Sequence, residues 1–323
     1  MGVRRLAFAA AALIATSGSS FAMQAAPAAP AAPAAPAAQP DFSAVQVRTT
    51  DLGNKIFWME MVGPNGQQGG NVVAAVGDDG IIMVDSNFAP MNDKIKAAVA
   101  AISPLPIRYV VNTHFHGDHT GGNAGFASAG VTIVAHDNVR KRLSEGTVNG
   151  LTGARTPPAM PAVLPVETYP ERTTARLRGR VAIVGHPANA HTDGDSYVRF
   201  DDANVLATGD IVTFGRYPNI DFANGGNING MVSALDLYLQ LTNDSSKVVP
   251  GHGPLGTKAM LVEYRQMLVT SRERVQKLIA EGKTEAEIVA AKPNADYDAR
   301  YNMNEMQAGN FMRVIYRSLK PAG

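Results

Sequence analysis

The sequence predicts one α/β domain in which β-sheets are covered by helices. Apolar runs typical of strands alternate with helical patterns in both halves of the chain, as in folds built from sheets and helices. The chain has 323 residues, of which 45% are hydrophobic, so it can bury a large core. Three of its seven histidines fall within six residues of the segment "NTHFHGDHTGG", directly after one of the apolar runs. The predicted fold therefore has a loop rich in histidine at the end of a strand.

The elements of the first half follow from hydrophobic spacing and from turn residues. The segment 69–86 turns at "GDDG", which is a hairpin signal between two apolar runs. We expect strands at 55–62, within 69–86, at 107–113 and at 131–136. We expect helices at 91–102, at 121–130 and over "NVRKRLSEG". The strand at 107–113 delivers the histidine cluster to the loop that follows it.

The second half continues the same alternation. A proline-rich loop at 156–165 is followed by β-rich segments at 180–186 and 196–210, the latter a hairpin around Asp202–Asn204. Beyond them we expect a helix at about 229–242, a strand at 247–251 and further helices up to residue 319. Because strands and helices alternate in both halves, a single α/β domain is expected.

The N-terminus has the pattern of an export signal. The basic segment "MGVRR" precedes the apolar run "LAFAAAALIATS", and small residues lead to an expected cut after Ala22. This run is too short to span a bilayer comfortably, which favours export over a retained anchor. Ala-Ala-Pro repeats then favour an extended, disordered spacer. We therefore expect a signal peptide at 1–22, a spacer at 23–45 and a catalytic domain at 46–323, in the periplasm of a double-membraned bacterium.

The composition excludes several classes of protein. The net charge of +1 offers no broad electrostatic attraction to nucleic acid. The chain has no cysteine, so it has neither a lipoprotein attachment site nor a disulfide framework. No stable membrane insertion is expected once the signal peptide is removed. The sequence does not determine the oligomeric state.

The cluster of His114, His116, Asp118 and His119 suits metal binding, because imidazole and carboxylate groups are zinc ligands. Alternating positions at a strand end can aim His114 and His116 at one ion. Asp118 and His119 lie across the tight turn at Gly117 and face a different direction. The loop is too short to wrap all four side chains around one ion. The spacing therefore suggests two neighbouring metals.

Three further metal-capable side chains stand at junctions between strands and loops. They are His191 in "NAHTDGDS", Asp210 in "VLATGDIV" and His252 in "VVPGHGP". The neighbouring glycines allow the backbone to approach closely. Taken singly, each of these side chains could equally have a structural role and bind no metal. Together with the cluster they supply the ligands that two metals need.

In combination these motifs resemble the metallo-β-lactamase superfamily, over roughly residues 50 to 265. The cluster matches the family's His-x-His-x-Asp-His signature, and "HTDGD", "TGD" and "PGHGP" match its later motifs in the right order. The resemblance implies an αβ/βα four-layer sandwich, with a metal site at one edge between two sheets. Asp85 in "IIMVDS" matches the family's first motif, which implies a side chain that orients the site.

The resemblance also implies a ligand set for two zinc ions that share one carboxylate. The ligands are His114, His116 and His191 for one ion, Asp118, His119 and His252 for the other, and Asp210 as the bridge. The two remaining histidines, His136 and His186, fill no vacant place in this set.

Two zinc ions about 3.5–4 Å apart can share a hydroxide whose pKa falls near neutrality. Such a hydroxide attacks an electrophilic carbonyl that the first zinc polarises, and Asp118 is placed to orient it. The second zinc accepts the charge of the leaving group or holds a substrate carboxylate. The sequence has no Gly-x-Ser-x-Gly nucleophile motif. We therefore expect a metal-dependent hydrolase that acts on a small molecule without a covalent intermediate.

The substrate class is left between two alternatives. Export and the family resemblance favour a β-lactamase, which could also hydrolyse other substrates. However, dedicated β-lactamases of the family typically have cysteine or serine at the bridging position, where this chain has Asp210. An aspartate bridge resembles glyoxalase II and the acyl-homoserine lactonases. Because a glutathione thioester is a cytoplasmic substrate, a lactonase is the stronger alternative for an exported protein.

Other branches of the same family fit less well. A nuclease of this fold should carry a basic surface or an added arm, and an oxidoreductase would use iron and often a fused flavin domain. A relative that only binds metal should have lost ligands, whereas this chain has all seven. The expected partner is therefore a small molecule, a β-lactam or a lactone.

Several aromatic side chains are candidates for the wall of a substrate pocket. They are Trp58, Phe88, Phe214, Tyr217 and Phe222. A place in the hydrophobic core is the equal alternative for each of them. Arg216, in the loop after Asp210, is a candidate partner for a substrate carboxylate, although an exposed surface arginine is the favoured reading.

Overall fold

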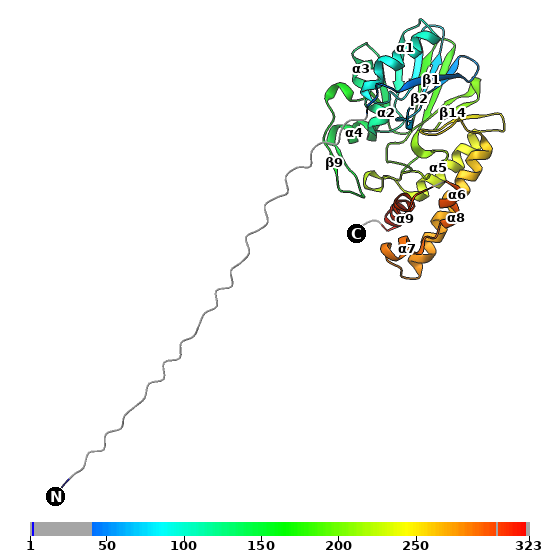
Figure 1. Ribbon diagram of the computed structural model, residues 1–323. Helices are drawn as coiled ribbons and strands as arrows, with labels where there is room; N and C mark the ends of the chain where they lie inside the picture. The colour runs from blue at the N-terminus through cyan, green and yellow to red at the C-terminus, as the bar shows by residue number, and fades with distance from the viewer. Residues whose placement is uncertain (1, 3–40, 302, 321–323) are drawn as a thin grey trace. The chain divides into compact units, whose positions relative to one another are not determined.

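The computed structural model describes residues 2, 41–301 and 303–320 (Figure 1). The predicted signal peptide, apart from Gly2, and the predicted spacer up to residue 40 lie outside these residues. The strands are β1 (Gln46–Asp51), β2 (Ile56–Gly63), β3 (Gly66–Gln67), β4 (Val72–Val76), β5 (Ile81–Val84), β6 (Ile107–Val111), β7 (Thr132–His136), β8 (Thr147–Val148), β9 (Arg155–Thr156), β10 (Glu167–Tyr169), β11 (Arg172–Leu177), β12 (Arg180–Gly185), β13 (Tyr197–Phe200), β14 (Val205–Ala207) and β15 (Lys247–Val249). The α-helices are α1 (Asn92–Ile102), α2 (Gly117–Thr120), α3 (Asn123–Ala127), α4 (Asp137–Glu145), α5 (Ile228–Leu241), α6 (Lys258–Ala280), α7 (Glu285–Ala291), α8 (Ala295–Arg300) and α9 (Glu305–Leu319).

The strands form two large sheets and one small hairpin. The first sheet has eight strands in the order β1-β2-β4-β5-β6-β7-β10, with β3 paired to β2. The second sheet has five strands in the order β11-β12-β13-β14-β15, and β8 and β9 pair in a separate hairpin. Most neighbouring strands are antiparallel, but β5, β6, β7 and β10 run parallel to one another in the first sheet, and β14 runs parallel to β15 in the second.

Alternate side chains along each strand face different layers, because successive residues of a strand point to opposite faces of the sheet. In β4, Val73 and Ala75 belong to the apolar core between the two sheets. Val72, Ala74 and Val76 of the same strand belong to the core beneath α1 and α3. The first sheet is therefore buried on both faces, which explains why β4 is apolar at every position.

The second sheet is built in the same way. Val205 and Ala207 of β14 face the first sheet, whereas Leu206 packs against side chains of α5, α6 and α9. Figure 1 shows α1 and α3 on one outer side and α5 and α6 on the other. The order of layers is helices, sheet, sheet, helices, so the predicted αβ/βα four-layer sandwich is confirmed.

The folded domain begins earlier than the sequence predicts. The sequence predicts that residues 41–45 belong to the disordered spacer, yet Phe42 and Val45 are buried in the core beneath α1. Lys94 of α1 donates hydrogen bonds to the carbonyl oxygens of Phe42, Ser43 and Val45. The boundary at residue 46 is therefore wrong, because two apolar side chains next to the proline repeats are part of the fold.

The chain continues beyond β15 into four helices. The long helix α6 packs against α5 and α9, and α7 packs against α9. Both α7 and α9 begin with a capping box, formed by Thr284 with Glu287 and by Asn304 with Gln307. Figure 1 shows α7, α8 and α9 together at the end of the domain away from α1 and α3. Within the described part of the chain, no helix has both the length and the apolar character needed to cross a membrane.

Candidate metal centre

The predicted ligands come from loops that follow strands of both sheets. Asp85 follows β5 and the cluster at 114–119 follows β6, while Asp210 follows β14 and His252 follows β15. Because each of these strand pairs is parallel, the loops of a pair leave the sheet at the same edge. His191 lies in the loop between β12 and β13. The sandwich therefore brings five chain segments to one place.

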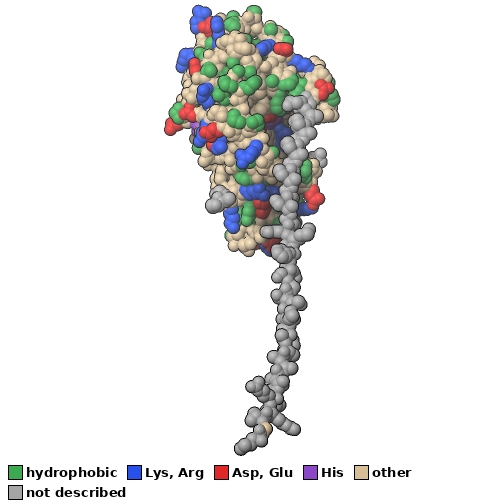
Figure 2. Space-filling model, turned by 90° about the vertical axis from the view of Figure 1, so that its left-hand side faces the viewer, with side chains coloured by type: hydrophobic (Ala, Val, Ile, Leu, Met, Phe, Trp, Pro, Cys, Tyr) green, Lys and Arg blue, Asp and Glu red, His purple; other side chains and the backbone are tan. Residues whose placement is uncertain are grey.

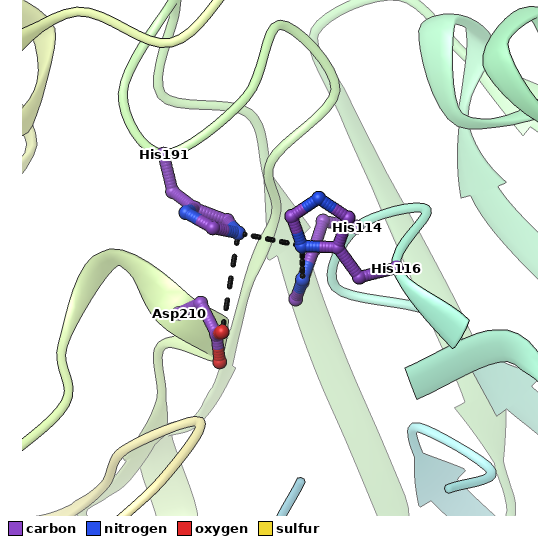
Figure 3. A group of neighbouring side chains, drawn as sticks. All are labelled: His114, His116, His191 and Asp210. Carbon is purple, nitrogen blue, oxygen red and sulfur yellow. Dashed lines mark hydrogen bonds and ion pairs between the residues drawn. The ribbon is translucent and has the colours of Figure 1, made fainter. Parts of the chain in front are cut away.

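Three imidazoles of the first group point toward one another (Figure 3). The Nδ1 atom of His116 lies 3.1 Å from Nε2 of His114 and 3.0 Å from Nε2 of His191. The Oδ2 atom of Asp210 lies 3.9 Å from Nε2 of His191. Ligand atoms of all four residues lie within 4.8 Å of one another.

The outer nitrogen of each imidazole has its own hydrogen-bond partner. Nε2 of His116 lies 3.0 Å from a carboxylate oxygen of Asp221, and Nδ1 of His191 lies 2.8 Å from the carbonyl oxygen of Asn219. Nδ1 of His114 lies 3.1 Å from the hydroxyl of Thr113. Carboxylate and carbonyl oxygens only accept hydrogen bonds, so the protons of His116 and His191 are on the outer nitrogens. The hydroxyl of Thr113 donates its proton to Asp85, so it accepts the hydrogen bond from Nδ1–H of His114.

This arrangement leaves unprotonated nitrogens about 3 Å apart at the centre of the group. Three lone pairs at such a separation repel one another unless a cation lies between them. Tetrahedral zinc takes imidazole nitrogens, and a metal-bound histidine usually donates its other N–H to an oxygen, as these do. The residues present therefore fit a metal ion.

The second group combines two imidazoles with carboxylates. Oδ2 of Asp118 lies 3.0 Å from Nε2 of His252 and 3.6 Å from Nε2 of His119. Oδ1 of Asp210 lies 3.2 Å from Nε2 of His119 and 3.4 Å from Nε2 of His252. One oxygen of Asp210 thus faces each group, which is the position of the predicted bridge. Nε2 of His119 and Oδ1 of Asp210 are buried polar atoms without a hydrogen-bond partner, as expected of atoms that face a metal.

Asp85 lies where it can orient the second group. Its Oδ2 atom is 2.7 Å from Nδ1 of His119, and its two oxygens accept hydrogen bonds from the backbone and hydroxyl of Thr113 at 2.7 and 2.8 Å. The φ angle of Asp85 is 63°, in the left-handed region that a side chain rarely occupies. A strained backbone held by three buried contacts is typical of a functional position.

Burial and neighbouring charges set the ionisation of the first group. Burial, and then the nearby His119 and His191, lower the pKa of His114 well below its ordinary value. Burial, and then His116, lower the pKa of His191 to about 4. His114 and His191 are therefore neutral at physiological pH, which is the form that binds a metal.

In the second group the carboxylates are ionised despite their burial. Burial opposes the charge of Asp118, but His119 and His252 lower its pKa to about 2. Burial also opposes a charge on His119, yet Asp118, Asp85 and Asp210 raise its pKa well above its ordinary value. The group therefore stabilises positive charge, which a divalent cation would supply.

Two glycines let the backbone pass close to the ligands. A Cβ atom at Gly251 would lie 2.0 Å from Oδ1 of Asp210, and one at Gly70 would lie 2.4 Å from Cε1 of His119. No side chain fits at such distances. These positions therefore need glycine.

Sequence reasoning missed the polar network beneath the histidine cluster. The carbonyl oxygen of His119 accepts hydrogen bonds from the backbone and hydroxyl of Ser86 and from the side chain of Asn112. Asn112 and Asn123 exchange hydrogen bonds through their buried amides. Asn112 stands next to the cluster in the sequence, but its partners are set only by the fold.

Asp221 was also missed, although its signal was present. It lies eleven residues after Asp210, in a loop where the sequence drew attention only to aromatic residues and an arginine. Its side chain accepts hydrogen bonds from Asn224 at 2.9 and 2.8 Å in addition to its contact with His116. A carboxylate in a loop that also carries a ligand is a candidate for orienting a histidine.

Most of the predicted pocket aromatics lie elsewhere. Trp58 is buried between the two sheets, and Phe214 is buried against Tyr264 in the core of the second sheet and its helices. Tyr217 is buried in that same core. For these three side chains the pocket-wall prediction is wrong, because the apolar layers of the sandwich take them up.

The other two aromatic candidates are closer to the surface of the domain. Phe88 is half-buried and packs on Phe42, with ring centres 5.3 Å apart. Phe222 lines a small cavity that reaches His116. Arg216 is exposed, as the favoured reading holds. Phe222 is therefore the one of the five aromatic candidates that lines this cavity.

His136 and His186 lie outside both groups of candidate ligands. Their rings stack on each other with centres 3.7 Å apart and an angle of 18°. Nε2 of His136 lies 2.8 Å from the carbonyl oxygen of Pro170, and Nδ1 of His186 lies 2.6 Å from that of Asp195. The pair connects β7 of the first sheet with the end of β12 in the second.

A family model described as "Metallo-beta-lactamase superfamily" matches residues 65–252, more than half of the chain. The chain belongs to the metallo-β-lactamase superfamily. The match ends at His252, so α6 to α9 follow the region that the superfamily model covers.

Solved structures of superfamily members share this fold. A metallo-β-lactamase from Pontibacter korlensis superimposes with a TM-score of 0.58 and 18% identity, covering 69% of this chain and 99% of that one. The metallo-β-lactamase DIM-1 gives a TM-score of 0.58 and 17% identity, covering 70% and 99%. At this level of identity, the likeness shows the superfamily fold.

Curated relatives are similar over a shorter stretch. The chain is 27% identical over 151 residues to the 2,4-dinitroanisole O-demethylase subunit alpha of Nocardioides sp. (strain JS1661), covering 46% of this chain and 43% of that protein. It is 27% identical over 164 residues to a hydroxyacylglutathione hydrolase of Polaromonas sp., covering 50% and 55%. The chain thus spans about half the length of the curated relatives it matches.

Proposed function

We propose that this superfamily hydrolase is a β-lactamase that uses two zinc ions. The observation that carries the proposal is the pair of converging groups that share Asp210. Of the candidate ligands, His114, His116 and His191 would hold one ion, and Asp118, His119 and His252 would hold the other. The solved structures named above, which are metallo-β-lactamases, support the choice of substrate.

Zinc supplies Lewis acidity to such a site and lowers the pKa of water. The chain's own residues supply position and charge. Asp118 is ionised and 22% exposed, so its carboxylate is accessible to a water molecule and can accept a hydrogen bond from it. His119 and Asp210 are more deeply buried and fix the base of the site. In the proposed reaction, water adds its oxygen to the lactam carbonyl carbon, the C–N bond breaks, and the nitrogen takes a proton.

The surface is compatible with a small-molecule partner. On the face shown in Figure 2, Lys and Arg side chains are interspersed with Asp and Glu. A mixture of this kind does not form the continuous basic stripe that binds nucleic acid.

A second candidate function is lactone hydrolysis, and one residue favours it. Asp210 stands at the bridge, where the sequence resembles lactonases and glyoxalase II more than dedicated β-lactamases. The partial similarity to a hydroxyacylglutathione hydrolase points in the same direction. Both reactions use the same carbonyl chemistry, so the ligands alone do not separate them.

A substrate panel tests the proposal. Zinc-loaded full-length protein is given a chromogenic cephalosporin, an acyl-homoserine lactone and an acyl thioester under the same conditions. We expect the cephalosporin to be hydrolysed fastest, and a chelator to abolish the reaction. Asp210→Ala should lower kcat/KM by at least about a hundredfold, because it removes the carboxylate shared by both groups.

The panel also defines failure. Rapid cleavage of the lactone with an intact cephalosporin would replace the first proposal with the second. Asp236→Asn serves as the control, since Asp236 pairs with Arg265 on the surface and not with a candidate ligand. Its rates should equal those of the wild type.

A further inference from the structure

A small cavity adjoins the metal centre at His116. Its volume is about 150 Å³, and besides His116 its lining comes from three separate parts of the chain. These parts are the hairpin β8–β9, the loop that contains Asp221, and helix α9. Because whole small-molecule ligands usually occupy about 300–1,000 Å³, this cavity has room for one substituent of a substrate.

Helix α9 forms one wall of this cavity through Val314. The side chain of Val314 is 3% exposed and belongs to the core that joins the second sheet to its helices. One turn further along, Arg317 donates a hydrogen bond of 3.0 Å to the carbonyl oxygen of Gly150 in the β8–β9 hairpin. The guanidinium of Arg317 also lies 5.6 Å from the ring centre of Phe222. A single helix thus contacts both other walls.

A second attachment holds the loop after Asp210 to the same helices. The hydroxyl of Tyr217 donates a hydrogen bond of 2.6 Å to Asp298 of α8. The ring of Tyr217 stacks on Phe311 of α9, with centres 4.1 Å apart and an angle of 18°. The position of this cavity wall therefore depends on helices that lie beyond the superfamily match.

The lining determines what kind of group the cavity accepts. Amide and hydroxyl side chains, among them Asn149, Asn219 and Thr147, alternate with the apolar Leu151 and Val314. Among the described residues that line the cavity there is no lysine or arginine, and the nearby guanidinium of Arg317 is paired with Glu285. The carboxylate of Asp221 also faces it, and like charges repel. Such a lining suits an uncharged group that forms hydrogen bonds and carries a short apolar end.

We propose that Val314 on α9 sets the substrate selectivity by closing a pocket for the uncharged acylamino group next to the scissile carbonyl. The inference rests on the proposed function, because it assumes that the carbonyl is cleaved at the metal centre. Among the described residues that line the cavity, His116 is the one candidate ligand, so a group that enters the cavity lies beside this imidazole. The proposal places the scissile carbonyl within reach of such a group. β-Lactams and acyl-homoserine lactones both carry an acylamino group at this position. The pocket favours short acyl chains and rejects those that end in a carboxylate.

Two substitutions of Val314 test the proposal. The substrates are two series, one of β-lactams and one of homoserine lactones, in which only the acyl chain grows from acetyl to octanoyl. Val314→Ala enlarges the pocket and should shift the best chain length upward, raising kcat/KM for longer chains about tenfold relative to acetyl. Val314→Leu should shift it downward. A carboxylate at the end of the chain should lower kcat/KM in the wild type.

Val275→Ala is the matched control. Val275 is fully buried in the same core cluster but does not line the cavity. It should reduce thermal stability about as much as Val314→Ala and leave the order of chain lengths unchanged. If Val314→Ala and Val314→Leu also leave that order unchanged, the pocket proposal is wrong.

Binding without turnover separates this inference from the proposed function. The ring-opened N-acyl homoserines are titrated calorimetrically into zinc-loaded wild type and both Val314 variants. The same shift in chain length is expected in Kd, whether or not a ring is cleaved. A shift in Kd without hydrolysis of either series would support the pocket and overturn the proposed activity. An identical order of Kd values in all three proteins would overturn the pocket.

Discussion

At the scale of single residues, the metal centre is defined by which nitrogen of each histidine faces inward. The inward nitrogens of His114 and His116 lie too close together for both to carry a proton. The hydrogen-bond partners of the outer nitrogens therefore determine that the proton is on the outer side and that the inner nitrogen is free to bind a metal. Asp85 and Asp221 perform this task for His119 and His116 from different sheets. The sequence identifies the candidate ligands. The hydrogen bonds of these carboxylates hold the histidines in the orientation and tautomer that a metal requires.

Removing the carboxylate of Asp221 should weaken zinc binding. Asp221→Ala leaves the outer N–H of His116 without its acceptor, so the imidazole is free to rotate or change tautomer. We expect the zinc affinity of the full-length protein to fall about 10–100-fold, measured by competition with a chromogenic chelator. Asp221→Asn keeps an acceptor oxygen and should retain more of the affinity.

The Asp236→Asn variant again serves as the control for a lost surface charge, and its affinity should match the wild type. Equal zinc affinities for wild type, Asp221→Ala and Asp236→Asn would show that Asp221 does not orient His116. A thermal unfolding curve for each metal-free variant separates a loss of folding from a loss of affinity.

At the scale of secondary-structure elements, the ends of strands and the contacts between sheets determine the geometry. The loops after the parallel pairs β5–β6 and β14–β15 carry the candidate ligands other than His191, and the stacked His136 and His186 connect the sheets away from them. The Nδ1–H of His186 donates to the carbonyl of Asp195. Burial, opposed by this hydrogen bond, lowers the pKa of the His186 imidazole.

This depressed pKa predicts a loss of stability in acid. A histidine whose pKa is lower in the folded state stabilises the fold fully above its unfolded pKa of about 6.5, and this stability is lost as the pH falls below that value. His186 should contribute at most about 1.4 kcal/mol per pH unit to the free energy of unfolding. His186→Asn should be less stable at neutral pH but should lose less stability on acidification, as measured by urea unfolding.

Both proteins are compared without metal, so that zinc release does not contribute to the difference. The ligand histidines titrate alike in the two proteins and cancel in the comparison. Parallel curves of unfolding free energy against pH would contradict a role for His186.

At the scale of the whole molecule, the superfamily core is extended at its C-terminal end. The superfamily match ends at residue 252, and α9 then lines the cavity beside His116 through Val314 and holds the loop of Tyr217 through Phe311. These helices are part of the same core cluster as the second sheet. The region outside the match is therefore integral to the fold and forms a wall beside the site.

The N-terminal segment gives a prediction about location. We propose that residues 1–22 direct export and are removed, because a basic start, an apolar run and small residues occur in the order of a signal peptide. Expressed in a double-membraned bacterium, the protein should be found in the periplasmic fraction, and N-terminal sequencing should start at Met23. Replacing Leu13 and Ile14 with arginine should retain the protein in the cytoplasm. Recovery of an uncut chain from the cytoplasm would contradict this proposal.

The sequence by itself determined the fold class and the candidate ligands. The periodicity of apolar residues predicts strands and helices because secondary structure depends on residues that are close in the sequence. The spacing within 112–122 indicates two metals because a loop this short cannot direct all four side chains at one ion. His191, Asp210 and His252 were found for a related reason, since each stands beside a strand end and a glycine. The superfamily resemblance then supplied their grouping.

Only the tertiary structure decided which residues complete the site. Asp221 contacts His116 although the two are 105 positions apart in the sequence. Val314, on the last helix, lines the cavity that borders His116. The local sequence around Trp58, Tyr217 and Phe222 does not distinguish a core residue from a pocket residue. The packing of the layers buries Trp58 and Tyr217 and leaves Phe222 at the cavity. Such contacts join residues far apart in the chain, so no local pattern encodes them. The ligands of this protein can therefore be identified from its sequence, while the shape of its pocket depends on how the layers pack.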